Sequence, residues 1–346
     1  MTTFFSTVSK LGKLTIASAF IAFSFSSCVK NTSSDSTLVG NWVRSFEFEG
    51  VGRTEAVSFT IGTVTYVGGG YDGTKRLQDF WKFDGATGTW TRVADFPGTA
   101  RNSAFAFGAN GKGYVGGGYD GDDNKLKDFW EYNPTTNAWT QKNDFLGTAR
   151  IGATTFVLND KGYVCGGYDG SYLKDLWMYD PLSDEWIQRA SLAGSKRMDA
   201  VAFTYNNNAY VVTGVNNGSY LADFWSYNPS SNSWTQKRSI SDATDSSFDD
   251  DYSEYIKRSN AVIFVIGSKA YLTTGTRNGI ISSTWEYDIT TDLWKEKTAF
   301  EGSSREGAVS FVWNGVGYVL TGSNSTYRYD DMFLFHPDDE VNTKDN

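Results

Sequence analysis

Arginine recurs at one fixed place in a period of about fifty residues, and its side chain is the first candidate for chemistry in this chain. Successive members of the series are 47 to 49 residues apart, except for one step of 61. A guanidinium group presents planar, paired donors that suit a carboxylate or a phosphate. Gathered at one place, these arginines would form a binding site for an acidic ligand. The six are Arg53, Arg101, Arg150, Arg197, Arg258 and Arg305.

Three of the repeats continue with a tyrosine in an Asp-Gly turn, in "GGGYDGTKRLQDFW", "GGGYDGDDNKLKDFW" and "CGGYDGSYLKDLW". These tyrosines, candidates for the same site, are Tyr71, Tyr119 and Tyr168. The other three repeats depart from the pattern with Val215, Thr276 and Ser323. The acids of "DFW" and "DLW" are predicted to be turn and strand-start residues and not catalytic acids; they are Asp79, Asp128, Asp175 and Asp223.

Three further acids lie close to the arginines and are the candidates for catalysis. Glu306 follows Arg305 directly, and Glu55 and Asp199 lie two residues after their arginines. A carboxylate buried beside arginines has a tuned pKa and can act as an acid or a base. Strand alternation places Glu306 on the opposite face from Glu55 and Asp199, so we do not expect all three to point inward.

Several kinds of catalytic site are excluded by composition. The chain has one histidine, His336, and two cysteines, Cys28 and Cys165. With the one histidine on the predicted closing strand, we expect no Ser-His-Asp set, Cys-His pair or zinc cluster. We expect no cofactor and no resident metal. One alternative stays open, in which acids of the insertion "SISDATDSSFDDDYSEYIK" (Asp245, Asp249, Asp250, Asp251) ligate Ca²⁺, although the spacing lacks the calcium-loop pattern.

The elements that position these residues are short strands. The second repeat reads as four of them, "NSAFAFG", "KGYVGGG", "KDFWEYN" and "AWTQKND", separated by turn residues. A tryptophan marks the fourth strand at nearly the same period, and we expect it to pack between neighbouring repeats. Its positions are Trp42, Trp90, Trp139, Trp186, Trp234 and Trp294.

The two ends of the chain predict a closed ring. A lone fourth strand, "NWVRSFEFEG", precedes the first full repeat, and the last repeat stops after its third strand, "DDMFLFHP". Pairing of these two strands would complete the last unit and remove the open edges. Strand direction then brings the six arginines and the three tyrosines to one mouth of the central channel.

Six such units, each with four strands, a Gly-Gly pair and a fixed tryptophan, resemble the kelch repeat over residues 40–336. The resemblance implies an all-β fold, a six-bladed kelch-type β-propeller. In kelch propellers that bind acidic peptides, arginines and tyrosines at these positions line the pocket. Galactose oxidase shares the fold, but its copper site needs two histidines. A periplasmic sialic acid epimerase is also similar, and it implies an enzyme alternative that would use Glu306, Asp199 or Glu55.

The N-terminal residues predict export. Residues 1–27 hold a basic start and a short apolar run, and they resemble a bacterial lipoprotein signal that ends at Cys28, the predicted lipidation site. A plain signal peptide is the alternative. Residues 28–39 are expected to form a tether and residues 337–346 a disordered acidic tail. A net charge of −9 argues against a nucleic-acid partner.

Three functions remain open. The first is a non-catalytic, lipid-anchored propeller of the cell envelope that binds a carbohydrate or an acidic ligand through the mouth. The second is docking of a partner protein at the same face, and the third is a sugar-modifying enzyme. The arginines also have a purely structural alternative, in which they pair with an aspartate of a neighbouring blade or cap loop carbonyls.

Overall fold

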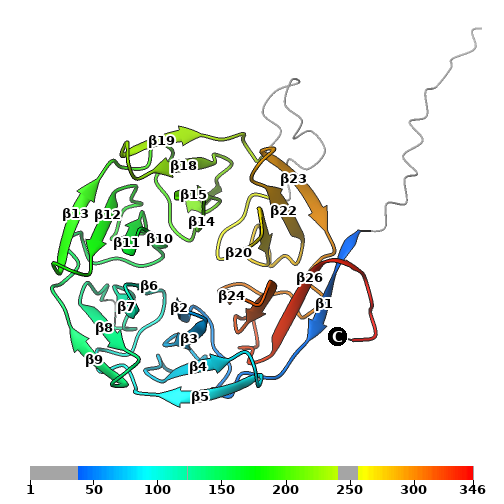
Figure 1. Ribbon diagram of the computed structural model, residues 1–346, viewed down its shortest axis with the longest axis horizontal. Coiled ribbons are helices and arrows are strands. Elements are labelled where there is room, and N and C mark those ends of the chain that lie inside the picture. The colour runs from blue at the N-terminus through cyan, green and yellow to red at the C-terminus, as the bar shows by residue number, and fades with distance from the viewer. Residues whose placement is uncertain (1–37, 123, 241–255, 346) are drawn as a thin grey trace, which may run out of the picture. The chain divides into compact units, whose positions relative to one another are not determined.

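The computed structural model describes residues 38–345, apart from residue 123 and residues 241–255. In these residues the chain folds into six four-stranded antiparallel sheets arranged around a central channel (Figure 1). The kelch-type β-propeller predicted from the sequence is confirmed. The described residues include no helix that is long and apolar enough to cross a membrane.

Each blade runs from an inner strand at the channel to an outer strand. The strands of blade 1 are β2 (Val57–Ile61), β3 (Val64–Gly68), β4 (Phe80–Asp84) and β5 (Thr89–Val93). Those of blade 2 are β6 (Phe105–Ala109), β7 (Lys112–Gly116), β8 (Phe129–Asn133) and β9 (Ala138–Gln141). Those of blade 3 are β10 (Thr154–Leu158), β11 (Lys161–Cys165), β12 (Leu176–Asp180) and β13 (Glu185–Arg189).

Blades 4 and 5 follow the same order. The strands of blade 4 are β14 (Val201–Tyr205), β15 (Asn208–Val212), β18 (Trp225–Asn228) and β19 (Ser233–Gln236). Its loop between β15 and β18 carries a small hairpin of β16 (Val215–Asn216) and β17 (Ser219–Tyr220). The strands of blade 5 are β20 (Val262–Ile266), β21 (Lys269–Thr273), β22 (Thr284–Asp288) and β23 (Leu293–Lys297).

Blade 6 joins the two ends of the propeller. Its strands are β24 (Val309–Trp313), β25 (Val316–Leu320), β26 (Met332–Glu340) and β1 (Val39–Arg44). Strand β1 pairs antiparallel with β26, and Trp42 lies opposite Phe335. The closure predicted from the sequence is therefore confirmed.

The last residues of the chain belong to this closure. Strand β26 continues to Glu340, which pairs with Val39. Beyond the strand, the Arg44 amide donates to the Asp345 carbonyl at 3.0 Å, and the Asn342 amide donates to Asn41 Oδ1 at 2.7 Å. The expectation of a disordered tail is wrong for residues 337–345, because the edge of β1 offers backbone and side-chain partners that the composition does not reveal.

The hydrophobic core lies between blades. Each of the six clusters of buried apolar side chains combines residues of two adjacent blades. Trp139 of blade 2 contacts Phe80 of blade 1 at 5.0 Å between ring centroids, and Trp186 of blade 3 contacts Phe129 of blade 2 at 4.9 Å. The tryptophan series thus packs between neighbouring blades, as predicted, and does not form a ligand box.

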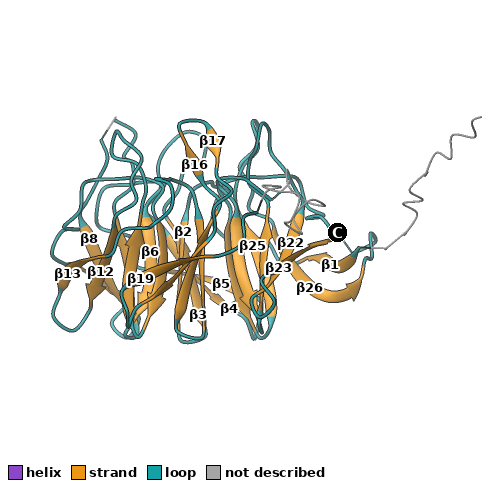
Figure 2. Ribbon diagram, turned by 90° about the horizontal axis from the view of Figure 1, so that it is seen from above, coloured by secondary structure: helices purple, strands orange, loops and turns teal. Residues whose placement is uncertain are grey.

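The two faces of the propeller differ in their loops. One face carries the tight turns between β2 and β3 and their equivalents, whereas the other, here called the upper face, carries longer loops and the β16–β17 hairpin (Figure 2). The loops that lead into the inner strands and those between the second and third strands both lie on this upper face. The predicted site residues lie in these two sets of loops.

Candidate functional site at the upper mouth of the channel

The six arginines lie inside the blades and are not available at the mouth. Their relative exposure is 0 to 2%. Arg101 illustrates the arrangement: its two Nη atoms donate to the two carboxylate oxygens of Asp128 at 2.6 and 2.7 Å, and Nη1 and Nε also donate to the carbonyls of Gly117 and Thr99. The role predicted for Arg53, Arg101, Arg150, Arg197, Arg258 and Arg305 as the wall of a ligand site is therefore not supported by their positions.

Their partners are the aspartates of the "DFW" and "DLW" segments of the same blade. Arg53 pairs with Asp79, Arg150 with Asp175 and Arg197 with Asp223. Arg305 pairs with Asp331. In blade 5 the equivalent position is Ser283, whose Oγ accepts from Arg258 at 2.7 Å. The structural alternative for the arginines describes this geometry, except that the aspartate belongs to the same blade and not to a neighbour.

The aspartates also hold the third strand of each blade. In four blades the tryptophan two residues later donates its indole N–H to the same carboxylate, at 2.7 to 2.8 Å; these are Trp81, Trp130, Trp177 and Trp225. Burial opposes ionisation of Asp79 and Asp128, but the arginine beside each carboxylate outweighs it and lowers the pKa. Five blades thus contain a buried arginine–aspartate ion pair, and in blades 1 to 4 its carboxylate also accepts a hydrogen bond from an indole.

A closed ring of backbone hydrogen bonds surrounds the mouth. The residue two places after each arginine donates its amide to the carbonyl of the equivalent residue in the preceding blade, with N···O distances of 2.8 to 3.2 Å. All six have a positive φ between 51 and 63°, which glycine adopts freely and other residues rarely. The ring consists of Glu55, Ser103, Gly152, Asp199, Asn260 and Gly307.

This ring and the alanines that follow it line a cavity of about 180 Å³ at the upper end of the channel. The alanines are Ala56, Ala104, Ala153, Ala200, Ala261 and Ala308. Blades 3 and 6 have the strain-free glycine in the ring, whereas four blades place a polar side chain there at a cost of about 1 kcal/mol each. Strain of this kind is often found at functional sites.

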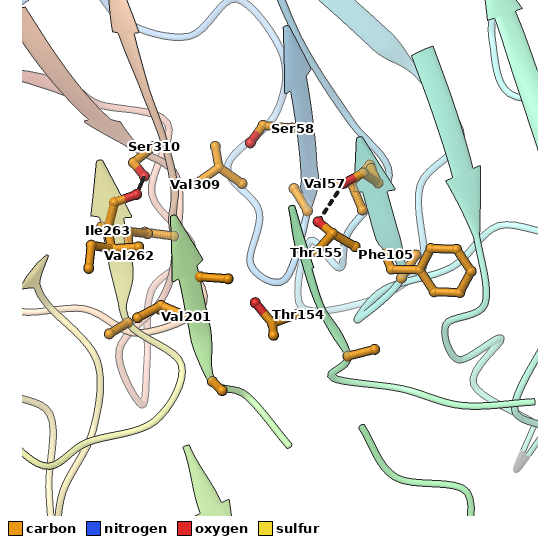
Figure 3. A pocket seen from close by; sticks show the side chains of 18 residues that line it. Val57, Ser58, Phe105, Thr154, Thr155, Val201, Val262, Ile263, Val309 and Ser310 are labelled. Atoms are coloured by element: carbon orange, nitrogen blue, oxygen red, sulfur yellow. Dashed lines mark hydrogen bonds between the residues drawn. The ribbon is translucent and has the colours of Figure 1, made fainter. Parts of the chain in front are cut away.

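Below the alanines the channel continues between the inner strands. A second cavity, of about 280 Å³, is lined by the inner strands (Figure 3). Thr155 donates its hydroxyl to the Ala106 carbonyl at 2.7 Å, and Ser310 donates to the Ile263 carbonyl at 3.2 Å (Figure 3). These two hydroxyls are used between neighbouring inner strands, and Ser58 and Thr154 add two further hydroxyls to the lining.

Three carboxyl groups influence one another at the mouth. Burial, together with the charges of Glu55 and Glu306, raises the pKa of Asp199 to about 8. The pKa of Glu306 is raised by burial and by Glu55, against a hydrogen bond from Asn260. Glu55 and Asp199 line the upper cavity and Glu306 does not, as strand alternation predicts. The charge of Glu306 nevertheless contributes to the raised pKa of Asp199.

Neighbouring side chains fix the orientation of two of these acids. Glu55 accepts a hydrogen bond from Asn102 Nδ2 at 2.5 Å and another from the Ser103 hydroxyl. The carboxylate of Asp199 lies over Gly152, where a Cβ would meet its Oδ1 at 2.4 Å. A side chain at position 152 would therefore displace Asp199.

The three predicted tyrosines lie in the upper loops beside this ring, and all are partly buried. Tyr71, Tyr119 and Tyr168 form β-bridges with the residues that directly follow the arginines of their blades. Val215, Thr276 and Ser323 make the equivalent bridges in the other three blades. The tyrosines are thus placed at the rim, where the sequence predicted them, whereas the six arginines of the repeat series are buried inside the blades.

Three basic residues that the sequence analysis did not single out also lie at this rim. Arg76 lies between two tyrosine rings, 4.7 Å from the centroid of Tyr71 and 5.0 Å from that of Tyr119. Lys125 lies 5.4 Å from the ring of Tyr168, and Arg328 lies 5.7 Å from that of Tyr71. The signal was present in the repeated segments, because Arg76 and Lys125 both directly precede the leucine of "RLQDFW" and "KLKDFW".

Other predictions fall outside the described residues or concern metals. Cys28, the signal segment and most of the insertion, including Asp245, Asp249, Asp250 and Asp251, lie outside the described part of the chain. Within residues 38–345, leaving out 123 and 241–255, no group of three or more His, Cys, Asp or Glu side chains is arranged to hold a metal ion. Cys165 is buried in β11.

The fold and the mouth define a six-bladed β-propeller with a polar cavity at one end of its channel. The model of the KLHDC2/KLHL20/DRC7 kelch-repeats domain matches residues 43–167, 97–249 and 143–296, overlapping matches that together span more than half of the chain. The protein therefore belongs to the kelch-repeat family.

Comparison with solved structures supports the same fold. The structure titled "Structure of YjhT" is similar with a TM-score of 0.68 and 18% sequence identity, over 84% of this chain and 96% of that chain. At this identity the likeness concerns the fold alone. No curated protein matches the chain.

Proposed function

We propose that this propeller binds a carbohydrate at the upper mouth of its channel. The observation that carries the proposal is the backbone ring, in which four of six equivalent positions bear polar side chains in a conformation that favours glycine. Those side chains, Glu55, Ser103, Asp199 and Asn260, all line the same cavity. A structural role alone would be served by glycine, as it is at Gly152 and Gly307.

The chemistry of these groups suits a polyhydroxylated ligand. Sugar hydroxyls both donate and accept hydrogen bonds, and the mouth offers both kinds of partner. The carboxylate of Glu55 accepts, Ser103 and Asn260 do both, and Asp199 at neutral pH is largely protonated and can donate. Tyr168 and Tyr172, whose rings lie 5.2 Å apart at the rim, add the aromatic surface on which sugar rings stack.

We also propose that the protein acts in the cell envelope as a lipid-anchored binder. The support is the N-terminal sequence, with its basic start, its short apolar run and the small residues before Cys28. An envelope protein would meet glycans there. Metabolic labelling with a palmitate analogue tests this part, since label should be incorporated by the wild type and not by Cys28→Ala. Equal labelling of both would contradict a lipid anchor at Cys28.

Thermal-shift screening of the purified protein against a panel of neutral, amino and acidic saccharides tests ligand binding. A ligand that binds only the folded state at a hundred times its Kd stabilises it by about 2.7 kcal/mol. At the upper end of ordinary domain sizes, where 1 kcal/mol shifts the Tm by somewhat under 2 °C, this corresponds to an increase in Tm of about 4 to 5 °C. We expect at least one saccharide to raise the Tm of the wild type, and not that of Glu55→Gln or Asp199→Asn.

Asp95→Asn is the matched control for these variants, because Asp95 pairs with Arg92 on the exposed outer strand, away from the channel. Its response to the saccharide should equal that of the wild type. A shift that survives in both mouth variants would place the ligand elsewhere. No shift with any saccharide would contradict carbohydrate binding and would favour the docking of a partner protein at this face.

A second candidate, a sugar-modifying enzyme, is favoured by one observation. The cavity is lined by Asp199 of blade 4, which holds its proton up to a pH of about 8, and by Glu55 of blade 1, which accepts two hydrogen bonds. Two carboxyl groups in different protonation states are the requirement for general acid–base catalysis. Following a bound saccharide by NMR in the presence of the protein distinguishes the two functions. Conversion that Asp199→Asn abolishes would indicate an enzyme, whereas an unchanged saccharide would indicate a binder.

A further inference from the structure

One set of six matched positions on the rim above the mouth is divided into a basic and a non-basic part. In each blade one residue pairs across a β-bridge with the rim tyrosine or its equivalent, and these six residues are structurally matched. Blades 6, 1 and 2, which are consecutive around the ring, carry the basic members; blades 3, 4 and 5 carry tyrosine, tyrosine and isoleucine. In blade order the six are Arg76, Lys125, Tyr172, Tyr220, Ile280 and Arg328.

The three basic side chains have no acidic partner in the described structure. No carboxylate of the described residues forms a salt bridge with Arg76, Lys125 or Arg328, in contrast to the paired arginines inside the blades. Arg76 Nε donates to Asn102 Oδ1 at 2.9 Å, and Arg328 Nε is buried without a hydrogen-bond partner. Three uncompensated cations on one arc are unusual in a protein of net charge −9.

The arc also borders an open groove. A cavity of about 600 Å³ lies between the upper loops of blades 6 and 1, and Arg328, Tyr327 and Thr74 are among the residues that line it. Its one acid, Asp72, accepts hydrogen bonds from the amides of Thr74 and Lys75 and from the Thr74 hydroxyl. The Asp72 carboxylate is therefore oriented by its own turn through Oδ1.

A chain of hydrogen bonds connects the arc to the mouth. Arg76 bonds to Asn102, and Asn102 in turn donates to Glu55 at 2.5 Å. A ligand that reaches Glu55 therefore lies close to the basic part of the rim. An elongated ligand would leave the mouth over blades 1, 2 and 6, where it would meet one cation per blade.

We infer that the ligand is an acidic polysaccharide, with one sugar at the mouth and the anionic groups of its further sugars against Arg76, Lys125 and Arg328. This inference rests on the proposed carbohydrate site. Regularly placed cations on consecutive blades fit a chain with a repeated negative charge, and guanidinium groups suit carboxylate and sulfate alike. A saccharide fits better than an acidic peptide because the mouth between the cations offers hydrogen-bonding groups and alanine, and no deep apolar side-chain pocket.

The test compares acidic polymers with matched neutral ones by titration of the purified protein. One arm uses oligogalacturonate and its methyl ester, and the other uses a dextran sulfate oligosaccharide and the unsulfated dextran oligosaccharide. We expect the acidic member of one pair to bind about tenfold more tightly than its neutral partner, with an affinity that falls as salt is raised. The arm that responds identifies the anion as carboxylate or sulfate.

Single rim variants supply the residue-level test. Arg76→Gln, Lys125→Gln and Arg328→Gln should each weaken binding of the acidic polymer about three- to fivefold, because partly exposed ion pairs have modest individual effects. The affinity for the neutral partner should not change. Arg92→Gln removes an equal charge from the exposed outer strand and should leave both affinities as in the wild type.

The outcomes separate this inference from the proposed function. Equal binding of acidic and neutral polymers, with no effect of the rim variants, would overturn the inference and leave the carbohydrate site standing. Acidic binding that is lost in the rim variants but unaffected by Asp199→Asn and Glu55→Gln would support the arc and contradict the mouth as the sugar site. No binding of any saccharide would overturn both.

Discussion

Replacing Arg101 by alanine should lower the free energy of unfolding by about 3 to 5 kcal/mol, the cost of breaking a buried ion pair by removing one partner. The variant would leave Asp128 with a largely buried charge and would remove the donors to the carbonyls of Gly117 and Thr99. Arg101→Lys should recover only part of the loss, because an ammonium group cannot reproduce the two parallel bonds of the guanidinium. Chemical denaturation measures both variants.

The pH dependence of the free energy of unfolding provides a second test of the ion pair between Arg101 and Asp128. The pKa of Asp128 is lower in the folded protein than in the unfolded chain, so the pair stabilises the fold above the ordinary carboxyl pKa of about 4. That contribution is lost as the pH falls through the lowered pKa. The difference in stability between wild type and Arg101→Ala should therefore shrink below about pH 4.

Arg92→Ala is the control for both experiments, since Arg92 and Asp95 form an exposed pair whose loss should have little effect. An Arg101→Ala protein as stable as the wild type would contradict the structural role of the buried arginines. That result would favour the role first predicted from the spacing of the six arginines, in which they form a binding site for an acidic ligand.

Replacing Asp199 by asparagine should make the protein more stable, although it removes a residue of the proposed site. The folded-state pKa of about 8 lies far above the value of about 4 for an unfolded aspartate. Between these values the folded protein keeps a proton that the unfolded chain has released, so the free energy of unfolding falls as the pH rises from 4 to 8. Above pH 8 the folded state bears the full cost of the charge.

We expect the gain from Asp199→Asn to be about 1 to 3 kcal/mol at pH 8 to 9 and to approach zero near pH 4, after allowance for the partial exposure of the side chain. Asparagine also tolerates the left-handed backbone of this position. Thermal or urea unfolding across this pH range gives the result. A loss of stability, or a gain that does not depend on pH, would contradict the electrostatic strain at the mouth. Glu306→Gln should show a smaller gain of the same sign, since burial and Glu55 raise its pKa too.

The sequence predicted the architecture well because architecture is what repeats. The tryptophan and Gly-Gly series count six blades, and the unmatched strands around Trp42 and Phe335 identify the closure. The tail beyond His336 was missed, since its bonds to β1 depend on where Asn41 and Arg44 lie after closure.

The site was harder to predict because the position of a residue within the repeat does not show which other side chain it contacts in the folded protein. Asp79, Asp128, Asp175 and Asp223 recur with the same period as the arginines, and that match was the available sign of pairing. The rim cations lie in the variable part of the repeated segments, so only the β-bridges of the folded loops reveal Arg76, Lys125 and Arg328 as one set. The acids Glu55, Asp199 and Glu306 were predicted because they lie close to the arginines in the sequence. The arginine side chains themselves are buried inside the blades and do not line the mouth.

The most direct test of the proposed mouth is the number of protons exchanged when a saccharide binds. Calorimetric titration at pH 8 in two buffers of different ionisation enthalpy measures it, because near pH 8 Asp199 is about half protonated. If the sugar binds at the mouth, the heat of binding should depend on the buffer for the wild type, and Asp199→Asn should give no heat of binding. A buffer-independent heat for the wild type, or the same dependence in both proteins, would contradict the placement of the ligand at this site.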